Sequence, residues 1–457
     1  MKSTFDLQNP WRGPGYNFPK EKYIQRNIFD RLLDDLNQKE ITVVVGSRQA
    51  GKTFLMKKMI ERLITKESID PRQIFYFNFD AFNLIDLINN DRDFLDFIKY
   101  YGSPEKTSYI FLDEAQRVSE IGLLLKRYYD LGGNLKFIVS GSSSLQIKGQ
   151  VKETLTGRKH LFELYPITFR EFLQYKGIET HEELTRIIRF ESDRYQYLME
   201  EFVLFGGYPG VVKLDGADNK IRLLKEIYQS YVQKDISDFL KIEDIGGFNR
   251  MVQFLAHQTG GLCKINEMAK NIRLSRHFVE KYLFALDETY VMSFIRPYFV
   301  NLGKAIIKTP KVYFCDTGIR NAVFGQFESL DKRPDTGALV ENFVFSELVK
   351  SIDRDYLWFY RTVTGSEIDF LFVNGDDIIP IEVKYAITRQ KIVPKVYNTF
   401  IKHVGIKKAV IVTKDYLHEE RRGNLKVLFR PAWSVYNLNM EFEKITSNIG
   451  TELTVKR

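Results

Sequence analysis

The sequence predicts a multidomain α/β protein that opens with a parallel-sheet P-loop domain and closes with a second α/β domain. Three observations predict it: the length of 457 residues, a strand-loop-helix motif over residues 41–63, and a hairpin pattern over residues 367–384. A chain of this length holds about three domains at roughly 150 residues each. We therefore expect several domains rather than one core.

The first domain is indicated by the segment ITVVVGSRQAGKTFLMKKMIERL. A β-branched run over 41–45 leads into the spacing G-x-x-x-x-G-K-T, and apolar residues then recur at helical spacing. In such a P-loop the backbone N–H groups wrap phosphates, the lysine offsets their charge and the threonine hydroxyl holds Mg²⁺. The predicted nucleotide-binding residues of the loop are Gly46, Ser47, Arg48, Gln49, Ala50, Gly51, Lys52 and Thr53.

A second buried-strand run, 109–112, ends in Asp113 and Glu114. Ligands gather at the carboxyl ends of parallel strands, so we expect a Walker B site in which Asp113 holds Mg²⁺ and Glu114 activates the attacking water. A third strand, LKFIVSGSSS, ends in serines that include Ser140 and Ser142, which could sense the γ-phosphate. An ordinary polar loop explains these serines nearly as well. A further strand over 73–80 completes the alternation of strands and helices.

Together these motifs resemble a bacterial and archaeal AAA+ ATPase family. The resemblance is carried by GSRQAGKT, DEAQ, SGSSS, TGR and PITFREF, and by the later blocks FGGYPGVV and KVYFCDTGIR. It implies an AAA+ domain over 1–165 and makes Arg158 the arginine-finger candidate. This arginine would reach the nucleotide of a neighbouring subunit in a ring-like or head-to-tail homo-oligomer. A solvated surface arginine is the alternative.

The middle of the chain predicts helices. Apolar residues keep helical spacing across 166–245, which fits a helical lid. Within 246–325, a helix over 265–272, a start signal at Ser275 and two later strands predict a winged helix-turn-helix. Its second helix would offer cations to DNA, although winged helices also dock proteins. The predicted DNA-binding residues are Arg273, Arg276, His277 and Lys281.

The hairpin pattern EIDFLFVNGDDIIPIEVK places two acids opposite each other. Asn374 and Gly375 supply turn chemistry, and either loop length gives one register in which Asp369 faces Glu382. Lys384 then lies on the same face as Glu382. Like charges facing each other across two strands are destabilising, and a shared divalent cation would remove the repulsion. Two exposed acids on an edge hairpin remain the alternative.

The region 326–457 also resembles the PD-(D/E)xK nucleases, which have a restriction-endonuclease-like α/β fold. The order of elements carries the resemblance: an amphipathic helix over 336–352, the hairpin, a further helix and the strand KKAVIVTKD. It implies that Asp369 and Glu382 ligate Mg²⁺, that Glu341 adds a carboxylate from the helix, and that Lys384 positions the water. Isoleucine precedes the aspartate where the family often has proline.

Composition indicates the kind of binding partner and the cellular compartment of the protein. Lys and Arg number 67 against 59 Asp and Glu, and the net charge of +8 with a pI near 9.0 favours a polyanionic partner. Cys263 and Cys315 lack metal-ligand spacing and are expected to be buried thiols. No apolar signal core or run of 18 apolar residues appears, which predicts a cytoplasmic protein.

These observations predict an ATP-hydrolysing, DNA-binding protein with a Mg²⁺-dependent nuclease domain, in which ATP turnover is coupled to DNA remodelling or cleavage. The alternative is an ATP-dependent switch that binds DNA or a protein and uses the nuclease fold only for docking. A small-molecule kinase is disfavoured because Glu114 follows Asp113 in the position that activates water.

Overall fold

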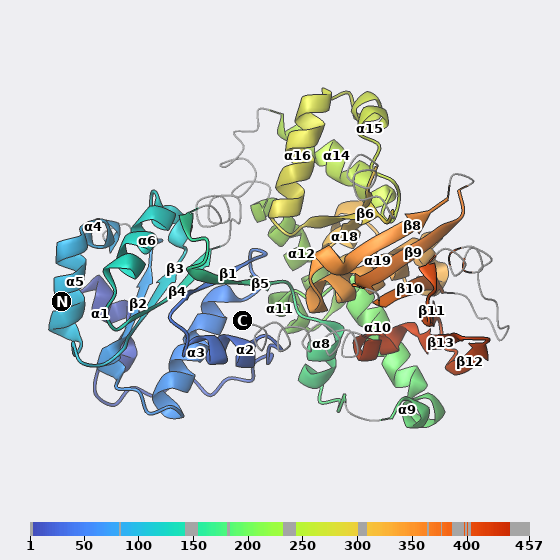
Figure 1. The fold of residues 1–457 in the computed structure, drawn as a ribbon. Helices are drawn as coiled ribbons and strands as arrows, with labels where there is room; N and C mark the ends of the chain where they lie inside the picture. The colour runs from blue at the N-terminus through green and yellow to red at the C-terminus, as the bar shows by residue number, and fades with distance from the viewer. Residues whose placement is uncertain are drawn as a thin grey trace. The chain divides into compact units, whose positions relative to one another are not determined.

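The computed structural model divides the chain into two compact units, Met1–Tyr165 and Pro166–Arg457 (Figure 1). Each unit is described by itself below. The structure describes residues 3–81, 84–141, 154–180, 183–231, 244–299, 309–362, 365–375, 377–385, 397, 400 and 404–438.

The first unit is built on a five-stranded parallel sheet in the order β2-β3-β4-β1-β5. Its strands are β1 (Ile41–Gly46), β2 (Ile74–Asn78), β3 (Ser108–Asp113), β4 (Leu135–Gly141) and β5 (Lys159–Leu164). The strands predicted over 41–45, 73–80 and 109–112 and in the segment LKFIVSG are therefore confirmed. Nearly all positions of β1 to β4 are buried, as expected for a parallel sheet covered on both faces, whereas the edge strand β5 is largely half-buried or exposed.

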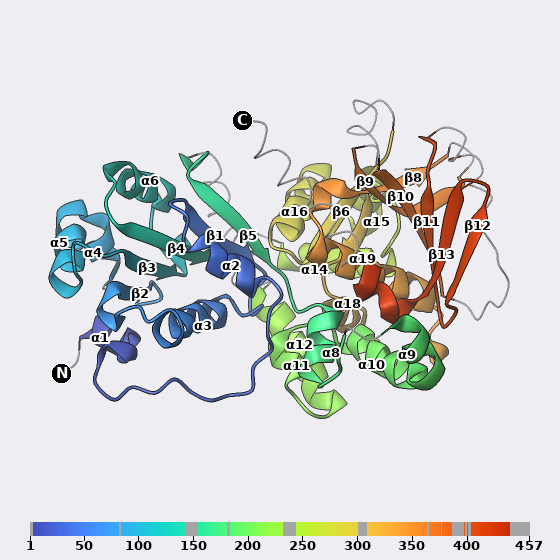
Figure 2. The same ribbon diagram turned by 60° about the horizontal axis from the view of Figure 1, so that its bottom comes forward.

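Helices cover both faces of this sheet (Figure 2). On one face α2 (Phe29–Asp35) and α3 (Lys52–Thr65) share a core with Trp11 of η1 (Pro10–Arg12), which follows α1 (Thr4–Gln8). On the other face Tyr128 of α6 (Ile121–Leu131) stacks on Phe137 of β4. The helices α4 (Ile85–Asn89) and α5 (Asp91–Tyr101) lie on the same side as α6. Because successive side chains of a strand point to opposite faces, the same strands present apolar residues to both layers of helices.

The second unit begins with helices and contains a mixed eight-stranded sheet in the order β12-β13-β11-β10-β9-β8-β6-β7. The strands are β6 (Met292–Pro297), β7 (Lys311–Phe314), β8 (Leu357–Arg361), β9 (Glu367–Asn374), β10 (Asp377–Lys384), β11 (Lys408–Thr413), β12 (His418–Arg422) and β13 (Leu425–Pro431). The helices are α8 (Phe169–Tyr175), α9 (Leu184–Phe190), α10 (Ser192–Phe205), α11 (Pro209–Val212), α12 (Ala217–Tyr231), α14 (Ile245–His257), α15 (Ile265–Ile272), α16 (Arg276–Glu288), α18 (Thr317–Phe324) and α19 (Thr336–Ser351).

The hairpin register is confirmed. Strand β9 pairs antiparallel with β10, with Val373 opposite Ile378 and Leu371 opposite Pro380. The helix pair predicted around Ser275 is also present, since Ser275 caps α16 by accepting a hydrogen bond from Phe278 N–H. Both cysteines are free and buried, as predicted.

The strands predicted as a wing belong to a larger sheet. Strand β6 pairs antiparallel with β7 and also runs parallel to β8, so both strands continue the sheet that holds the hairpin. The boundary expected between residues 325 and 326 therefore runs through one sheet.

The helix expected to be amphipathic, α19, is instead buried on almost every side. From Leu339 to Val349 all positions except Glu341 are buried, because strands β7 and β10 and helices α10 and α18 all pack against this helix. No helix within the described ranges combines the length and hydropathy needed to cross a membrane.

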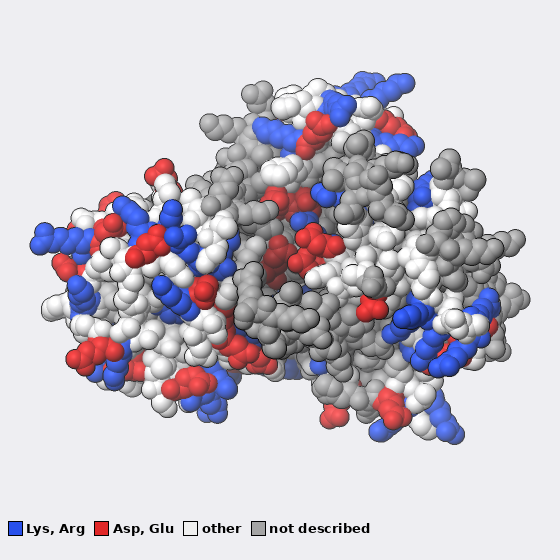
Figure 3. Space-filling model, viewed as in Figure 1, with Lys and Arg blue, Asp and Glu red and all other residues white. Residues whose placement is uncertain are grey.

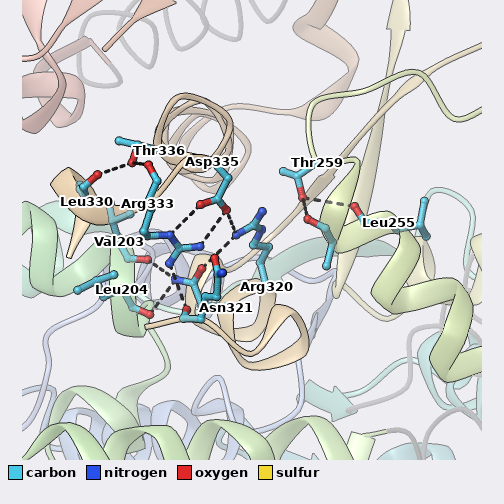
Figure 4. Close-up of polar contacts among 12 residues, drawn as sticks. Val203, Leu204, Leu255, Thr259, Arg320, Asn321, Leu330, Arg333, Asp335 and Thr336 are labelled. Atoms are coloured by element: carbon cyan, nitrogen blue, oxygen red, sulfur yellow. Dashed lines mark hydrogen bonds and ion pairs between the residues drawn. The ribbon is translucent and has the colours of Figure 1, made fainter. Parts of the chain in front are cut away.

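Charged groups are buried where α18 meets the start of α19 (Figure 4). Arg333 donates two hydrogen bonds of 2.9 Å to Asp335, and Arg320 donates a third, of 2.5 Å, to the same carboxylate. Asn321 donates to the carbonyl oxygens of Val203 and Leu204 at the end of α10. These bonds tie α10, α18 and α19 together and satisfy polar groups that burial would otherwise penalise.

A second buried polar group holds the first residues of this unit to α19. Glu347 accepts a 2.8 Å hydrogen bond from Phe169 N–H at the start of α8, and Lys350 donates to the carbonyl oxygen of Ile167 at 3.1 Å. Burial raises the pKa of Glu347 to about 7, against the lowering effect of Lys350 and with a contribution from Glu171. The carboxyl group of Glu347 therefore keeps its proton to higher pH in the folded protein than in the unfolded chain.

We predict that Glu347→Gln makes the stability of the protein less dependent on pH. The folded-state pKa lies above the ordinary value of 4.5, so the stabilisation is complete below about pH 4.5 and is lost as the pH rises through about 7. Glutamine imitates the protonated form. The free energy of unfolding of the variant, measured by urea denaturation relative to wild type, should rise by on the order of 3 kcal/mol from pH 5 to pH 8. Exposed Glu328→Gln is the control, and an equal difference at both pH values would contradict the prediction.

Candidate functional site

The loop between β1 and α3 has a backbone that glycine alone allows at two positions. At Gly46, with φ of +155°, a Cβ atom would lie 2.0 Å from the carbonyl oxygen of Leu164 on β5. Gly51, with φ of +101°, precedes the first residue of α3. The loop therefore folds tightly at the carboxyl edge of the sheet and directs the first N–H groups of a 14-residue helix toward it.

Lys52 lies buried inside this loop. Its Nζ donates to the carbonyl oxygens of Gly46 and Ser47 at 2.9 and 2.8 Å. Ala50 is also buried, whereas Arg48 is half-buried and Gln49 is exposed. An ammonium group held by two carbonyl oxygens at the mouth of a phosphate loop can exchange those partners for phosphate oxygens.

Asp113 is the most strongly hydrogen-bonded side chain of the site. Thr53 and Tyr76 each donate from a hydroxyl to Oδ2 at 2.7 Å, Ser140 donates to Oδ1, and the Glu114 N–H donates to Oδ1 at 3.2 Å. Burial raises the pKa of Tyr76, and the adjacent charge of Asp113 raises it further, so this phenol stays a donor. Four donors fix a fully buried carboxylate at the end of β3.

The two oxygens expected to hold Mg²⁺ therefore lie together. A hydroxyl and a carboxylate are hard oxygen ligands of the kind Mg²⁺ takes, and the Thr53 Oγ1 to Asp113 Oδ2 distance of 2.7 Å brings them side by side. The residues fit this ion. The predicted residue Ser142 lies outside the described residues. The contact of Tyr76 with Asp113 was not predicted, because a strand pattern does not reveal which aromatic residue faces the acid.

Glu114 adopts the left-handed backbone conformation, with φ of +55° and ψ of +39°. Its carboxylate accepts a hydrogen bond of 2.5 Å from Gln116 Nε2. A non-glycine residue in this conformation stores strain of order 1 kcal/mol, which is common at functional sites. The chain therefore turns immediately after Asp113, at the carboxyl end of β3.

Arg158 pairs with an acid of its own unit. Its Nε lies 2.8 Å and its Nη2 3.3 Å from the two carboxylate oxygens of Asp130, at the end of α6. The Arg158 side chain is 32% exposed, so this pair is a surface interaction of small net stability. The guanidinium group is thus held by a contact that is easily exchanged.

The cations expected to contact DNA lie on the surface of the helix pair. Arg273, Arg276 and His277 are exposed and Lys281 is half-buried. Arg276 forms a 2.8 Å ion pair with Glu280, and Figure 3 shows acidic side chains interspersed with basic ones over this part of the molecule. Phe278 and Phe284 of the same helix are also exposed. The surface is mixed in charge and partly apolar.

The hairpin acids face each other as predicted. Glu382 accepts from Asp369 N–H at 3.3 Å, Asp369 accepts from Val383 N–H at 2.8 Å, and Lys384 lies 2.6 Å from the Glu382 carboxylate. Burial, with the charge of Asp369, raises the pKa of Glu382 to about 7. The same two causes raise the pKa of Glu341 to about 6.

A lysine that the sequence did not reveal lies among these acids. Lys311 of β7 places its Nζ 2.5 Å from Glu367, 3.2 Å from Glu341 and 3.7 Å from Asp369. Tyr313 donates a 2.6 Å hydrogen bond to Glu341. Burial alone would lower the pKa of Lys311, but the three carboxylates raise it above its usual value. Lys311 and Tyr313 belong to the block KVYFCDTGIR. Nothing in the sequence of this block indicates that the two residues contact Glu341.

The predicted metal trio Glu341, Asp369 and Glu382 is already partnered by groups of the protein. Within the described ranges, no group of three or more His, Cys, Asp or Glu side chains is placed to hold a metal ion. Each carboxylate of the trio instead accepts from backbone N–H groups, lysines or Tyr313. Protein donors thus satisfy the charges that a divalent ion was expected to neutralise.

Three family models match consecutive parts of the chain. Residues 38–173 match an AAA domain, residues 196–330 match a domain of unknown function (DUF8612), and residues 336–433 match a second one (DUF4143). The first unit therefore contains an AAA-type P-loop ATPase domain.

Relatives extend over most of the chain. An uncharacterized protein of Haemophilus influenzae is 25% identical over 420 residues, covering 90% of this chain and 98% of the relative. The uncharacterized protein MJ1544 of Methanocaldococcus jannaschii is 27% identical over 397 residues, covering 85% and 83%. Their names assign no activity.

Two solved structures illustrate the structural likenesses. The Walker-type ATPase PABY2304 of Pyrococcus abyssi aligns with 68% of this chain and 99% of its own at a TM-score of 0.40 and 12% identity. The ORC1 protein of Aeropyrum pernix in complex with DNA aligns with 70% and 96% at a TM-score of 0.29 and 13% identity. At these TM-scores neither structure defines the fold of this chain.

Proposed function

We propose that this protein is an ATP-hydrolysing switch that binds DNA, and that ATP turnover in the AAA-type domain changes how the second unit engages its partner. The observation that carries the proposal is Asp113, a buried carboxylate that holds Thr53 of the phosphate loop and adjoins Glu114. Phosphate cradle, cation ligands and water-activating acid meet at one edge of the sheet.

The residues of this edge would divide the work of hydrolysis. The loop N–H groups and Lys52 bind the β- and γ-phosphates, and Lys52 gives up its two carbonyl partners to do so. Mg²⁺ held by Thr53 and Asp113 would neutralise charge on the phosphates. Glu114, held by Gln116, accepts the proton of the water that attacks the γ-phosphate.

DNA binding is supported by charge. The net charge of +8 and the exposed Arg273, Arg276 and His277 on α16 and the turn before it favour contact with phosphates. The exposed Phe278 and Phe284 support the alternative that this helix docks a protein.

Assembly into a homo-oligomer is supported by Arg158. The guanidinium group of Arg158 is partly exposed, pairs with the surface acid Asp130 and lies over the Tyr129 ring. It can turn to the nucleotide of a neighbouring subunit, where it would stabilise charge on the γ-phosphate.

Metal-dependent DNA cleavage by the second unit is the other candidate function. The opposed Asp369 and Glu382, with Lys384 beside them, favour it. The buried Lys311 opposes it.

The main proposal predicts that Glu114→Gln retains ATP binding but loses at least about 100-fold in turnover, because a general base contributes about that much. Phosphate release from purified protein, with and without duplex DNA, measures it. Exposed Glu120→Gln is the matched control. Unchanged turnover in Glu114→Gln would refute the assigned role.

In the same assay the double variant Arg273→Ala and Arg276→Ala should keep its basal turnover and lose stimulation by DNA. Replacing Arg92 and Lys99, two exposed cations of α5, controls for total charge. A wild-type protein that neither binds DNA nor responds to it would leave protein docking as the role of this surface.

The arginine-finger role predicts that Arg158→Ala binds ATP normally and hydrolyses it at least about 10-fold more slowly. Adding Lys52→Ala subunits, which keep their arginine, should restore part of the turnover. Asp130→Asn, which releases the guanidinium group without removing it, should remain active. Absence of any rescue in the mixture would argue against a shared site.

The cleavage candidate predicts that Asp369→Ala abolishes Mg²⁺-dependent nicking and keeps ATP turnover, whereas Glu114→Gln does the reverse. Asp377→Ala, an exposed acid of the same hairpin, is the control. Gel assays with single-stranded, duplex and branched DNA measure it. Wild-type protein that cuts none of these with Mg²⁺ or Mn²⁺ would exclude this candidate.

A further inference from the structure

Lys311 occupies the centre of the acidic cluster in the second unit. The side chain is only 2% exposed, although lysine is among the residues least often buried. Its Nζ faces carboxylates from two elements, Glu341 of α19 and both Glu367 and Asp369 of β9. A buried ammonium group needs such partners, and these acids need a cation.

The surrounding donors complete the neutralisation. Tyr313 donates to the Glu341 oxygen that also faces Lys311, and Arg361 pairs with the second oxygen of Glu367 at 2.9 Å. Asp369 accepts from Val383 N–H, and Glu382 pairs with Lys384. At least two donors of the protein therefore face each of the four carboxylates, those of Glu341, Glu367, Asp369 and Glu382.

We propose that the ammonium group of Lys311 is the resident cation of this cluster and takes the place of a divalent metal ion there. A Mg²⁺ ion needs carboxylate oxygens at about 2.0–2.1 Å, which here would bring it against a lysine nitrogen already 2.5 to 3.7 Å from the same oxygens. Like charges at that separation in a buried site exclude each other. The cluster is then a structural ion-pair core that joins β7, β9 and α19.

This inference does not depend on ATP hydrolysis. It bears on the cleavage candidate alone, because a metal ion that cannot enter cannot support phosphodiester chemistry at this cluster. A failure to detect ATP turnover would leave the metal measurements unchanged.

The test measures Mn²⁺ binding to the nucleotide-free protein, residues 1–457, by electron paramagnetic resonance of the free ion. Wild type and Asp369→Asn should bind equal amounts, since the cluster binds none in either protein. Lys311→Met, which keeps most of the side-chain length and removes the charge, should gain about one Mn²⁺ per chain, and the added Asp369→Asn should remove it. Mn²⁺ should raise the Tm of Lys311→Met by more than it raises the Tm of wild type, and the added Asp369→Asn should remove this difference.

Loss of bound Mn²⁺ on going from wild type to Asp369→Asn would overturn the proposal. A folded Lys311→Met that binds no additional Mn²⁺ would overturn it as well. If Lys311→Met does not fold, as the loss of a buried cation can cause, the comparison of wild type with Asp369→Asn decides alone. Lys311→Arg, which keeps the charge, should bind no more Mn²⁺ than wild type.

Discussion

A carboxylate that is removed from water needs a cation or several hydrogen-bond donors, and this constraint arranges both units of the chain. In the first unit Asp113 is buried and collects donors from α3, β2 and β4, so one side chain fixes the phosphate loop against the strands behind it. In the second unit Glu347 accepts a hydrogen bond from Phe169 N–H at the start of α8, and Asp369 accepts one from Val383 N–H near the end of β10. The carboxylates differ in what satisfies them. Hydroxyl groups of Thr53, Tyr76 and Ser140 surround Asp113, whereas the ammonium group of Lys311 lies beside Asp369.

That difference separates two sites that look alike in sequence. Both contain an acidic residue in an apolar strand, with a second acid close by. At Asp113 the partners are Thr53, Tyr76 and Ser140, whose hydroxyl groups can rotate to accept as well as donate. The partner at Asp369 is an ammonium group, which can only donate and carries its own charge. Neutral donors bring no charge that competes with a divalent ion, whereas the ammonium group of Lys311 already faces the carboxylate oxygens that such an ion would need.

Local sequence predicted the parts of the fold that local rules govern. The P-loop, the strand ending in Asp113 and the register of the β9–β10 hairpin follow from glycine spacing, apolar runs and a turn, which act within a few residues. The contact of Lys311 with Glu341 and Asp369 could not be predicted, because it joins three elements that are distant in sequence and leaves no spacing to recognise. For the same reason α19 was expected to have an exposed face: its stripe of Leu339 and Phe343 predicts one buried side and cannot reveal a second layer of helices.

Helix α19 connects the two ends of the second unit's polar framework. Near its end, Glu347 and Lys350 hold Phe169 and Ile167, the residues through which the chain enters this unit from the AAA-type domain. One and a half turns earlier, Glu341 faces Lys311. Because the helix is buried on nearly every side, it cannot bend or rotate without breaking packing at several neighbours at once. A displacement of the chain at residues 167–169 therefore has two outcomes: the bonds to Glu347 and Lys350 give way, or the whole helix moves and carries Glu341 relative to Lys311. The ion-pair core around Lys311 favours the first outcome, because movement of the helix would draw Glu341 away from the buried ammonium group of Lys311.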